Sequence, residues 1–386
     1  MMTAHVFVVD TKTFPVHLRY KFAGTGAREH QIDFNNSVNS SLHHTPENML
    51  AGMMADIGRI RRGDSIIFYL QQRAPRIPEG KFYGIFRAAE DYSFIDNNDG
   101  SQFLKNSLGK SLTFRTIFEP DRVYPEGVTE WEALDEIKGI SKPNQMIWSL
   151  IYRKLKGNRG CTMITEYEQD RLYDLLDRKN EGFVLDCDDQ SLDFDINTQR
   201  IFCSDLIPTE YSGRKESINL FPRLALKYLD GRSFEAHLQA EIVGGLGRDS
   251  DALSKMLIGE STIEWLGNEV SCGVGMQKID VMFAFIRDGI RYVSPVELKS
   301  VRIQPAHVRQ VQRYVDWVQQ YYIPNLPSII SPTLITLNSQ SPLSYAVRQE
   351  IQRFNDHNSG STCERLRLVE FEVNSSAGLT FSINNY

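Results

Sequence analysis

The sequence lacks several features that define large classes of protein. Its five cysteines (Cys161, Cys187, Cys203, Cys272 and Cys363) are odd in number and include no C-x-x-C pair. This pattern excludes the usual zinc sites and predicts no disulfide framework. No stretch approaches the roughly 18 apolar residues that cross a bilayer, and no basic segment leads into an apolar core at the amino terminus. We therefore expect a reduced, cytoplasmic protein with no membrane contact.

An excess of positive charge and a nucleotide-binding loop are also missing. The chain of 386 residues carries a formal net charge of −6, so any contact with nucleic acid must use local basic patches. No G-x-x-x-x-G-K-[ST] motif is present, so ATP is not implied. The glycine-rich stretch at 244–247 follows no strand, and we interpret it as the end of a helix and a loop.

The length predicts two domains, and the composition (41% hydrophobic, 24% charged) is that of a globular protein. Apolar and aromatic runs predict amino-terminal strands at 5–9, 64–70, 81–87 and 112–118, and helices at 46–60, 145–154 and 166–176. The composition changes near 180, where residues 186–195 carry many aspartates. We expect one domain at 1–180, a linker region at 181–228 whose short apolar pieces could be strands of either side, and a second domain at 229–386.

The second half has a clearer pattern. A helix is predicted at 233–243 with Ser233 as its N-cap. Strands at 279–287 and 290–298 are joined by the turn signal Asp288-Gly289 and form a hairpin. A helix at 306–322 and a strand at 331–337 follow. This order predicts a mixed sheet flanked by helices, and the chain as a whole is expected to be α+β.

The hairpin carries a group of residues suited to metal-assisted hydrolysis. Asp280 lies on its first strand, and Glu297 and Lys299 lie on the second as E-x-K. Residues two apart on a strand share a face, so Glu297 and Lys299 point the same way. Two carboxylates can hold Mg²⁺ or Mn²⁺, and a lysine can orient water and stabilise charge on a phosphate. The alternative is a surface hairpin that carries these residues by chance.

Two helices offer supporting side chains. Glu235 on the preceding helix could complete the metal shell, with Glu241 as a rival that a solvated helix face explains better. Gln310 and Tyr314 form Q-x-x-x-Y on the following helix and so share one face. That face could point at the metal site or at DNA.

Residues 231 to about 322 resemble the RecB-type branch of the PD-(D/E)XK superfamily, and most of all the NucS-type nuclease domain. The matching segments are F-E-A-H-L, K-I-D, E-L-K and Q-x-x-x-Y. The resemblance implies a restriction-endonuclease-like fold and Mg²⁺- or Mn²⁺-dependent hydrolysis of DNA. By this match Glu235, Asp280 and Glu297 bind metal, Lys299 is the catalytic lysine, and Gln310 and Tyr314 support them. The amino-terminal half departs from that family, so its substrate specificity does not carry over.

The amino-terminal half has a basic turn, R-R-G-D at 61–64, that leads into an aromatic strand, with G-K-F-Y-G-I-F-R-A after it. This arrangement resembles the PUA-like group that holds the EVE and YTH domains, and it implies a small β-barrel that holds a nucleobase, often a modified one. Nucleic-acid contacts are then expected from Arg61, Arg62, Tyr69, Arg73 and Arg76. The first tryptophan is Trp131, whereas YTH-type cages rely on tryptophan, and aromatic residues on strands are more often part of a core.

Three functions remain open at this point. The first is a DNA endonuclease whose amino-terminal domain selects the target, with a role in restriction or defence. The second is a repair nuclease that acts on mismatched, branched or single-stranded DNA. The third is a non-catalytic nucleic-acid-binding protein with an inactive nuclease fold, which the presence of Asp280, Glu297 and Lys299 disfavours. Cutting of both strands by one site per chain favours a homodimer, although no interface signal is visible.

Overall fold

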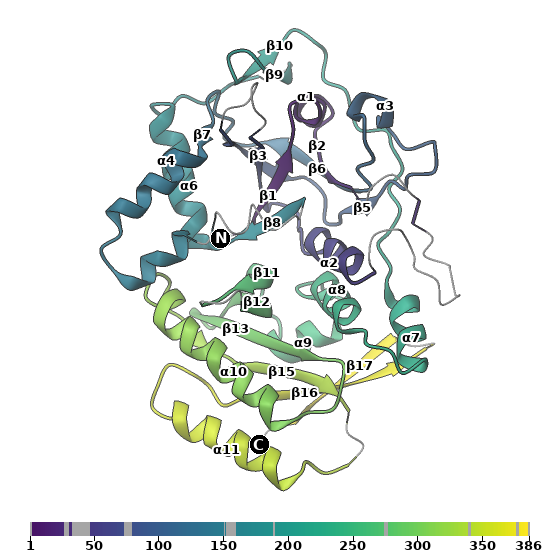
Figure 1. Cartoon of the computed structure of the whole chain (residues 1–386), viewed down its shortest axis with the longest axis vertical. Helices are drawn as coiled ribbons and strands as arrows, with labels where there is room; N and C mark the ends of the chain where they lie inside the picture. The colour runs from purple at the N-terminus through teal and green to yellow at the C-terminus, as the bar shows by residue number, and fades with distance from the viewer. Residues whose placement is uncertain are drawn as a thin grey trace. The chain divides into compact units, whose positions relative to one another are not determined.

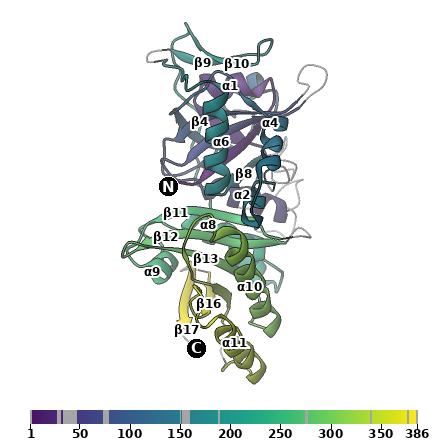
Figure 2. The same cartoon turned by 90° about the vertical axis from the view of Figure 1, so that its left-hand side faces the viewer.

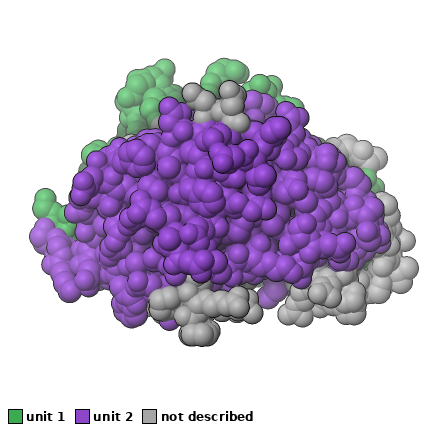
Figure 3. All heavy atoms as spheres, turned by 90° about the horizontal axis from the view of Figure 1, so that it is seen from above, with its two compact units in different colours: residues 1, 142–145, 219–386 green, residues 2–141, 146–218 purple. Residues whose placement is uncertain are grey.

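The chain forms two compact units, shown in different colours in Figure 3. The structure is a computed structural model, and it describes residues 2–26, 31–32, 47–72, 79–149, 151, 160–187, 190–273, 277–338, 341–375 and 378–384. The amino-terminal unit comprises residues 2–141 and 146–218, and the carboxy-terminal unit comprises residues 1, 142–145 and 219–386. Within the described ranges, no helix is both long and apolar enough to cross a membrane.

The amino-terminal unit is built on a curled sheet that forms a half-barrel (Figure 1). With the separate mixed sheet of the other unit, it confirms the predicted α+β class. The order along it is β2-β6-β4-β3-β1-β8, with β5 beside β6 and β7 beside β4. All neighbours are antiparallel except β1 and β3. The strands are β1 (Ala4–Val9), β2 (Phe22–Thr25), β3 (Ser65–Leu70), β4 (Lys81–Ala88), β5 (Phe94–Ile95), β6 (Phe114–Pro120), β7 (Val128–Thr129) and β8 (Cys161–Ile164).

The predicted apolar runs become these strands because both faces of the sheet are covered. Every residue of β3 is buried, and β4 is buried along most of its length. Phe68 packs against Phe14, Phe86 and Phe118 with ring centroids about 5.3–5.5 Å apart. The helices and helical turns of this unit are α1 (Thr13–Arg19), α2 (Glu47–Gly58), α3 (Lys105–Leu108), α4 (Glu130–Asp135), η1 (Glu136–Gly139) and α6 (Glu166–Lys179). The helical turn η2 (Pro143–Ser149) is divided, with residues 146–149 in this unit and residues 143–145 in the other.

The carboxy-terminal unit has its own mixed sheet, in the order β11-β12-β13-β15-β16-β17, with β14 beside β13. The first three strands are antiparallel, β13, β15 and β16 are parallel, and β17 is antiparallel to β16. The strands are β11 (Ile263–Ser271), β12 (Lys278–Arg287), β13 (Ile290–Lys299), β14 (Ile329–Ile330), β15 (Thr333–Leu337), β16 (Arg367–Asn374) and β17 (Gly378–Asn384).

Helices cover both faces of this second sheet (Figure 2). One face packs its apolar side chains, among them Val281, Val296 and Leu298, against α7, α8 and α9. On the other face α10 contacts β13 and β15, and α11 lies beside α10. The helices are α7 (Phe221–Leu229), α8 (Glu235–Gly245), α9 (Ala252–Ile258), α10 (Pro305–Trp317), the π-helical turn η3 (Val318–Tyr322) and α11 (Tyr345–Asn358).

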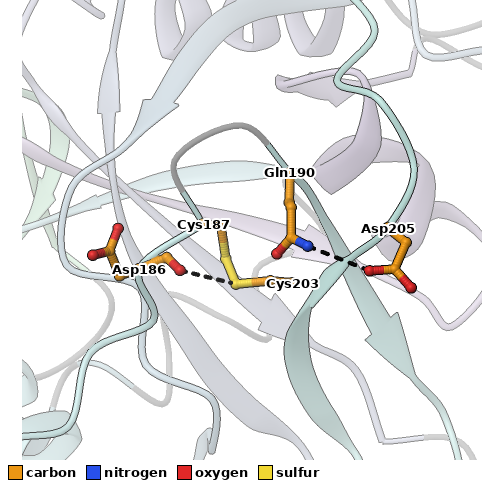
Figure 4. The surroundings of a disulfide bond; sticks show 5 residues. All are labelled: Asp186, Cys187, Gln190, Cys203 and Asp205. Atoms are coloured by element: carbon orange, nitrogen blue, oxygen red, sulfur yellow. Dashed lines mark hydrogen bonds between the residues drawn. A yellow bond between two sulfur atoms is a disulfide. The ribbon is translucent and has the colours of Figure 1, made fainter.

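Residues 181–228, predicted as a linker region, contain regular structure. The hairpin of β9 (Ser191–Asp195) and β10 (Arg200–Ser204) belongs to the amino-terminal unit, and α7 belongs to the carboxy-terminal one. A disulfide joins Cys187 to Cys203, next to the hydrogen bond that Gln190 donates to Asp205 (Figure 4). The prediction that no cysteines pair is wrong here, because the hairpin folds two cysteines 16 residues apart onto each other.

Some predicted helix ends need correction. The N-cap of α8 is Phe234, which makes no side-chain cap, so Ser233 does not have the predicted role. In the helix predicted at 145–154, residues 145–149 belong to the 3-10 helix η2, and Ile151 is α-helical. The long helix at 306–322 is α-helical only to Trp317 and continues as a π-helical turn. The Asp288-Gly289 turn is confirmed, because both residues have the positive φ (52° and 76°) that a tight hairpin turn requires.

Candidate active site

The three central residues of the predicted site meet where two strands of the carboxy-terminal sheet separate. The ladder between β12 and β13 runs from Arg287↔Ile290 to Val281↔Val296 and ends there. Beyond that point β12 still pairs with β11, and β13 still pairs with β15. Asp280 and Glu297 are the next residues on the two strands. The sheet therefore opens into a fork with one carboxylate on each branch.

Asp280 closes the fork. Its Oδ2 accepts a hydrogen bond of 2.8 Å from the backbone N–H of Leu298, which would otherwise face the opened ladder. Burial and the neighbouring Glu297 carboxylate raise the pKa of Asp280 well above its usual value, although the Leu298 N–H and Lys299 favour the charged form. Burial and a second carboxylate nearby are the two conditions that disfavour the charged form of a carboxyl group.

Glu297 and Lys299 project together from β13, as their spacing predicts. The Glu297 side chain is fully buried, and its Oε1 lies 2.5 Å from Nζ of Lys299. Burial raises the pKa of Glu297 despite the nearby ammonium group. Burial alone would lower the pKa of Lys299, but the attraction of Glu297 outweighs it and leaves that pKa raised. Lys299 is therefore a cation held against the carboxylates.

Gln310 and Tyr314, the two residues predicted to share a helix face, join this cluster from α10. The Tyr314 hydroxyl lies 2.7 Å from Oε2 of Glu297 and 2.8 Å from the carbonyl oxygen of Lys278. Gln310 donates to the Tyr314 hydroxyl oxygen at 2.8 Å. Tyr314 is buried, and burial together with the Glu297 carboxylate raises its pKa far above the usual value, so its hydroxyl stays protonated. Its single proton serves one of the two acceptors at a time.

The choice between the two helix glutamates has a geometric answer. Glu235, the first residue of α8, places Oε1 3.4 Å from Nζ of Lys299. Glu241 lies two turns further along the helix, where burial and the charge of Asp251 raise its pKa. The structure thus brings Glu235 to the cluster, and Glu241 has a different neighbour.

Sequence reasoning missed one side chain at the site. Gln239 is buried on α8, one turn after Glu235, and its Nε2 donates a hydrogen bond of 2.7 Å to the carbonyl oxygen of Asp280. The bond ties α8 to the branch of the fork that carries Asp280. The only available signal was its spacing of four residues from Glu235, which puts both on one helix face.

A divalent metal ion suits the inner pair of carboxylates. Mg²⁺ typically binds through one or two carboxylates and completes its shell with water and substrate phosphates. Asp280 and Glu297 provide such a pair, and burial is the main cause that raises the pKa of both carboxyls although Lys299 acts in the opposite direction. No group of three or more His, Cys, Asp or Glu side chains in the described ranges is close enough to hold a metal. Glu235 thus approaches the pair only by way of Lys299.

The nucleic-acid contacts expected in the amino-terminal unit are less well placed. Tyr69 is 3% exposed, and its hydroxyl donates to Glu130 at 2.5 Å, which favours the core role that the sequence left open. Arg61 donates to the carbonyl oxygens of Gly58 and Ile60 and so stabilises the end of α2. Arg62 is exposed and pairs with Asp91 at 3.0 Å. Arg73 and Arg76 lie outside the described residues.

Comparison with known proteins gives little further guidance. No model of a known protein family matches the chain, and no curated protein matches it in sequence. Among solved structures the chain is similar to human THYN1 protein in complex with 5-methylcytosine containing DNA. That match has a TM-score of 0.26 and 9% sequence identity, and it covers 45% of this chain and 97% of that chain. At this level it transfers no ligand and no residue role.

Proposed function

We propose that the carboxy-terminal unit is a metal-dependent nuclease that hydrolyses phosphodiester bonds in DNA. The observation that carries the proposal is the fork itself, where the half-buried Asp280 and the buried Glu297 lie on diverging strands with Lys299 against Glu297. Placing two carboxylates and a lysine away from water costs free energy, and a purely structural role would be served better by apolar residues. A site for Mg²⁺ or Mn²⁺ explains why they are there.

Each side chain has a role in this chemistry. Asp280 and Glu297 would hold the metal ion, which would polarise the phosphate and activate a water molecule. Lys299 orients the water and stabilises the negative charge that develops on the phosphate. Tyr314 and Gln310 hold Glu297 in place, Gln239 holds the Asp280 backbone, and Glu235 positions Lys299.

The amino-terminal unit is assigned to target selection, including recognition of a modified base, in an enzyme of restriction or defence. This part rests on the likeness of residues 4–130 to PUA-like domains in sequence and on the half-barrel that they form. A repair nuclease acting on structured DNA is the second candidate, because the fork supports hydrolysis whatever selects the substrate. Cleavage of plain, cytosine-modified and branched DNA by the same preparation separates these candidates.

The test is cleavage of supercoiled plasmid in Mg²⁺ or Mn²⁺ by the wild-type chain, Asp280→Asn and Lys299→Ala. Both variants should lose at least about a hundredfold in rate, the range seen when one charge-stabilising group is removed. Glu241→Gln is the matched control, since it changes a half-buried carboxylate of α8 whose charged neighbour is Asp251, and its rate should stay within about twofold. Full cutting by either site variant would show that the fork is not the active site. A wild-type chain that binds DNA but never cuts it would support the inactive fold.

A further inference from the structure

Helices α10 and α11 lie side by side (Figures 1 and 2). A groove between them is lined by basic side chains, and α10 also carries Tyr314 of the proposed active site. Its volume is about 530 Å³. Val308 from α10 and Phe354 from α11 are buried and form an apolar floor. Arg309, Arg313 and Arg353 stand on its walls together with His357. The chain as a whole is acidic, so this concentration of arginine is a local exception.

The two acidic residues of the groove leave one arginine without a counter-charge. Glu350 forms ion pairs with two of the three arginines, with its Oε2 3.2 Å from Arg309 and 3.6 Å from Arg353. Asp316 accepts a hydrogen bond of 2.8 Å from Gln312. Arg313 is exposed, and its guanidinium donates a hydrogen bond of 3.5 Å to the carbonyl oxygen of Arg309. In the described part of the chain, no carboxylate is within ion-pair distance of Arg313.

The groove is connected to the site through α10. Arg309 immediately precedes Gln310, and Arg313 immediately precedes Tyr314, so each basic residue neighbours one that supports Glu297. Burial raises the pKa of the Cys272 thiol to about 12, and the charges of Arg313, Asp280 and Glu297 all act on that thiol as well. Arg313 and the two carboxylates of the fork thus share Cys272 as a neighbour.

We propose that this groove binds the sugar–phosphate backbone of a single nucleic-acid strand on its way to the fork. The inference rests on the proposed nuclease function and adds where the substrate is held. Arginines fit phosphate oxygens through their forked N–H donors. Arg309 and Arg313 are one helical turn apart, about 5.4 Å, and can reach neighbouring phosphates. The volume of about 530 Å³ suits a short stretch of one strand.

The groove is tested by binding, without cleavage. Binding of a fluorescent single-stranded oligonucleotide is measured in EDTA at several salt concentrations for the wild-type chain, Arg313→Gln and Arg353→Gln. Arg348→Gln is the matched control, because Arg348 is exposed on α11 but outside the groove. Each groove variant should weaken binding about fivefold to tenfold, and the salt slope should fall by about 0.7 for each phosphate that the variant no longer neutralises. The control should match the wild type.

The outcomes for the groove and for the nuclease can be told apart. Unchanged binding by both groove variants, or no oligonucleotide binding by the wild type, would overturn the groove whether or not plasmid is cut. Competition by polyglutamate as strong as by unlabelled oligonucleotide would also overturn it, since it would show a site for acidic peptides. Weaker binding by the groove variants together with intact wild-type binding but no cleavage would support the groove and refute the nuclease.

Discussion

His17 shows how strongly a single buried residue of the amino-terminal unit depends on its surroundings. Its ring stacks on Phe68 at 5.7 Å, and Nδ1 lies 2.8 Å from the carbonyl oxygen of Phe22. That carbonyl can only accept, so Nδ1 carries the proton and donates. Burial lowers the pKa of His17 to about 3, and the charge of Arg115 adds to the effect. The imidazole is therefore held neutral in the folded protein.

This shift predicts a loss of stability in mild acid. Below the usual histidine pKa of about 6.5 the unfolded chain takes up a proton that the folded chain refuses, so the contribution is complete above pH 6.5 and decreases as the pH falls toward 3. From pH 7.5 to pH 5 the loss amounts to about 2 kcal/mol. His17→Asn keeps a hydrogen-bond donor near the position of Nδ1 but has no group that titrates in this pH range. Between pH 7.5 and pH 5 its free energy of unfolding, measured in urea, should therefore fall by about 2 kcal/mol less than that of the wild type.

The matched control for His17 is His357→Asn, on the exposed face of α11. Its free energy of unfolding should follow the wild-type curve between pH 7.5 and 5. His5, also buried with a lowered pKa caused mainly by burial, adds to the slope of all three proteins and cancels in the comparison. An equally steep slope in His17→Asn would mean that other groups produce the acid sensitivity.

At the scale of elements, the hairpin of β9 and β10 has a covalent tie that can be tested. The disulfide between Cys187 and Cys203 closes a loop of 16 residues next to the hairpin. A loop of this length constrains the unfolded chain by about 3 kcal/mol in the entropic account. Cys203→Ser should lower the free energy of unfolding by about 2–3 kcal/mol in oxidising buffer, and by much less in dithiothreitol. Cys363→Ser, at a free cysteine of the other unit, is the control for a missing thiol. Equal stability of Cys203→Ser and wild type in both buffers would contradict the pairing.

The elements also show what the sequence could predict. Local signals were sufficient for the fork: the alternation of β12 and β13, the Asp288-Gly289 turn and the E-x-K spacing together place Asp280, Glu297 and Lys299 correctly. Helical spacing likewise predicts that Gln310 and Tyr314 share one face of α10, and the two side chains are hydrogen-bonded there. In each case the geometry follows from residues close together in the sequence.

Other features depend on partners far away in the sequence and had no local signal. Strand β11 was not predicted, since it contains Gly267, Asn268 and Glu269, which are poor strand formers, and pairing with β12 holds it in place. Nothing in the sequence distinguishes Gln239 from other polar residues of the helix, because its partner, the Asp280 carbonyl oxygen, is brought near only by the fold. The disulfide was missed for the same reason, because the approach of Cys187 to Cys203 depends on the hairpin.

At the scale of the whole molecule, the proposed chemistry is confined to one of two units that each have a core of their own. Metal binding should therefore be visible as a local event. Because a ligand at a hundred times its dissociation constant stabilises its site by about 2.7 kcal/mol, saturating Mn²⁺ should slow amide hydrogen exchange in β12 and β13 by about a hundredfold near the fork. Exchange in β1 and β3 should not change.

The exchange experiment separates a specific site from general binding of cations by an acidic chain. Asp280→Asn removes one of the two inner carboxylates but keeps an oxygen that can accept from Leu298, so the fork should stay folded while the protection by Mn²⁺ disappears. Glu241→Gln should keep the full protection. Protection that survives in Asp280→Asn, or that spreads equally over both units, would mean that Mn²⁺ acts through net charge. Loss of protection confined to the fork would tie metal binding to the same two carboxylates that the cleavage assay tests, and would do so without any turnover.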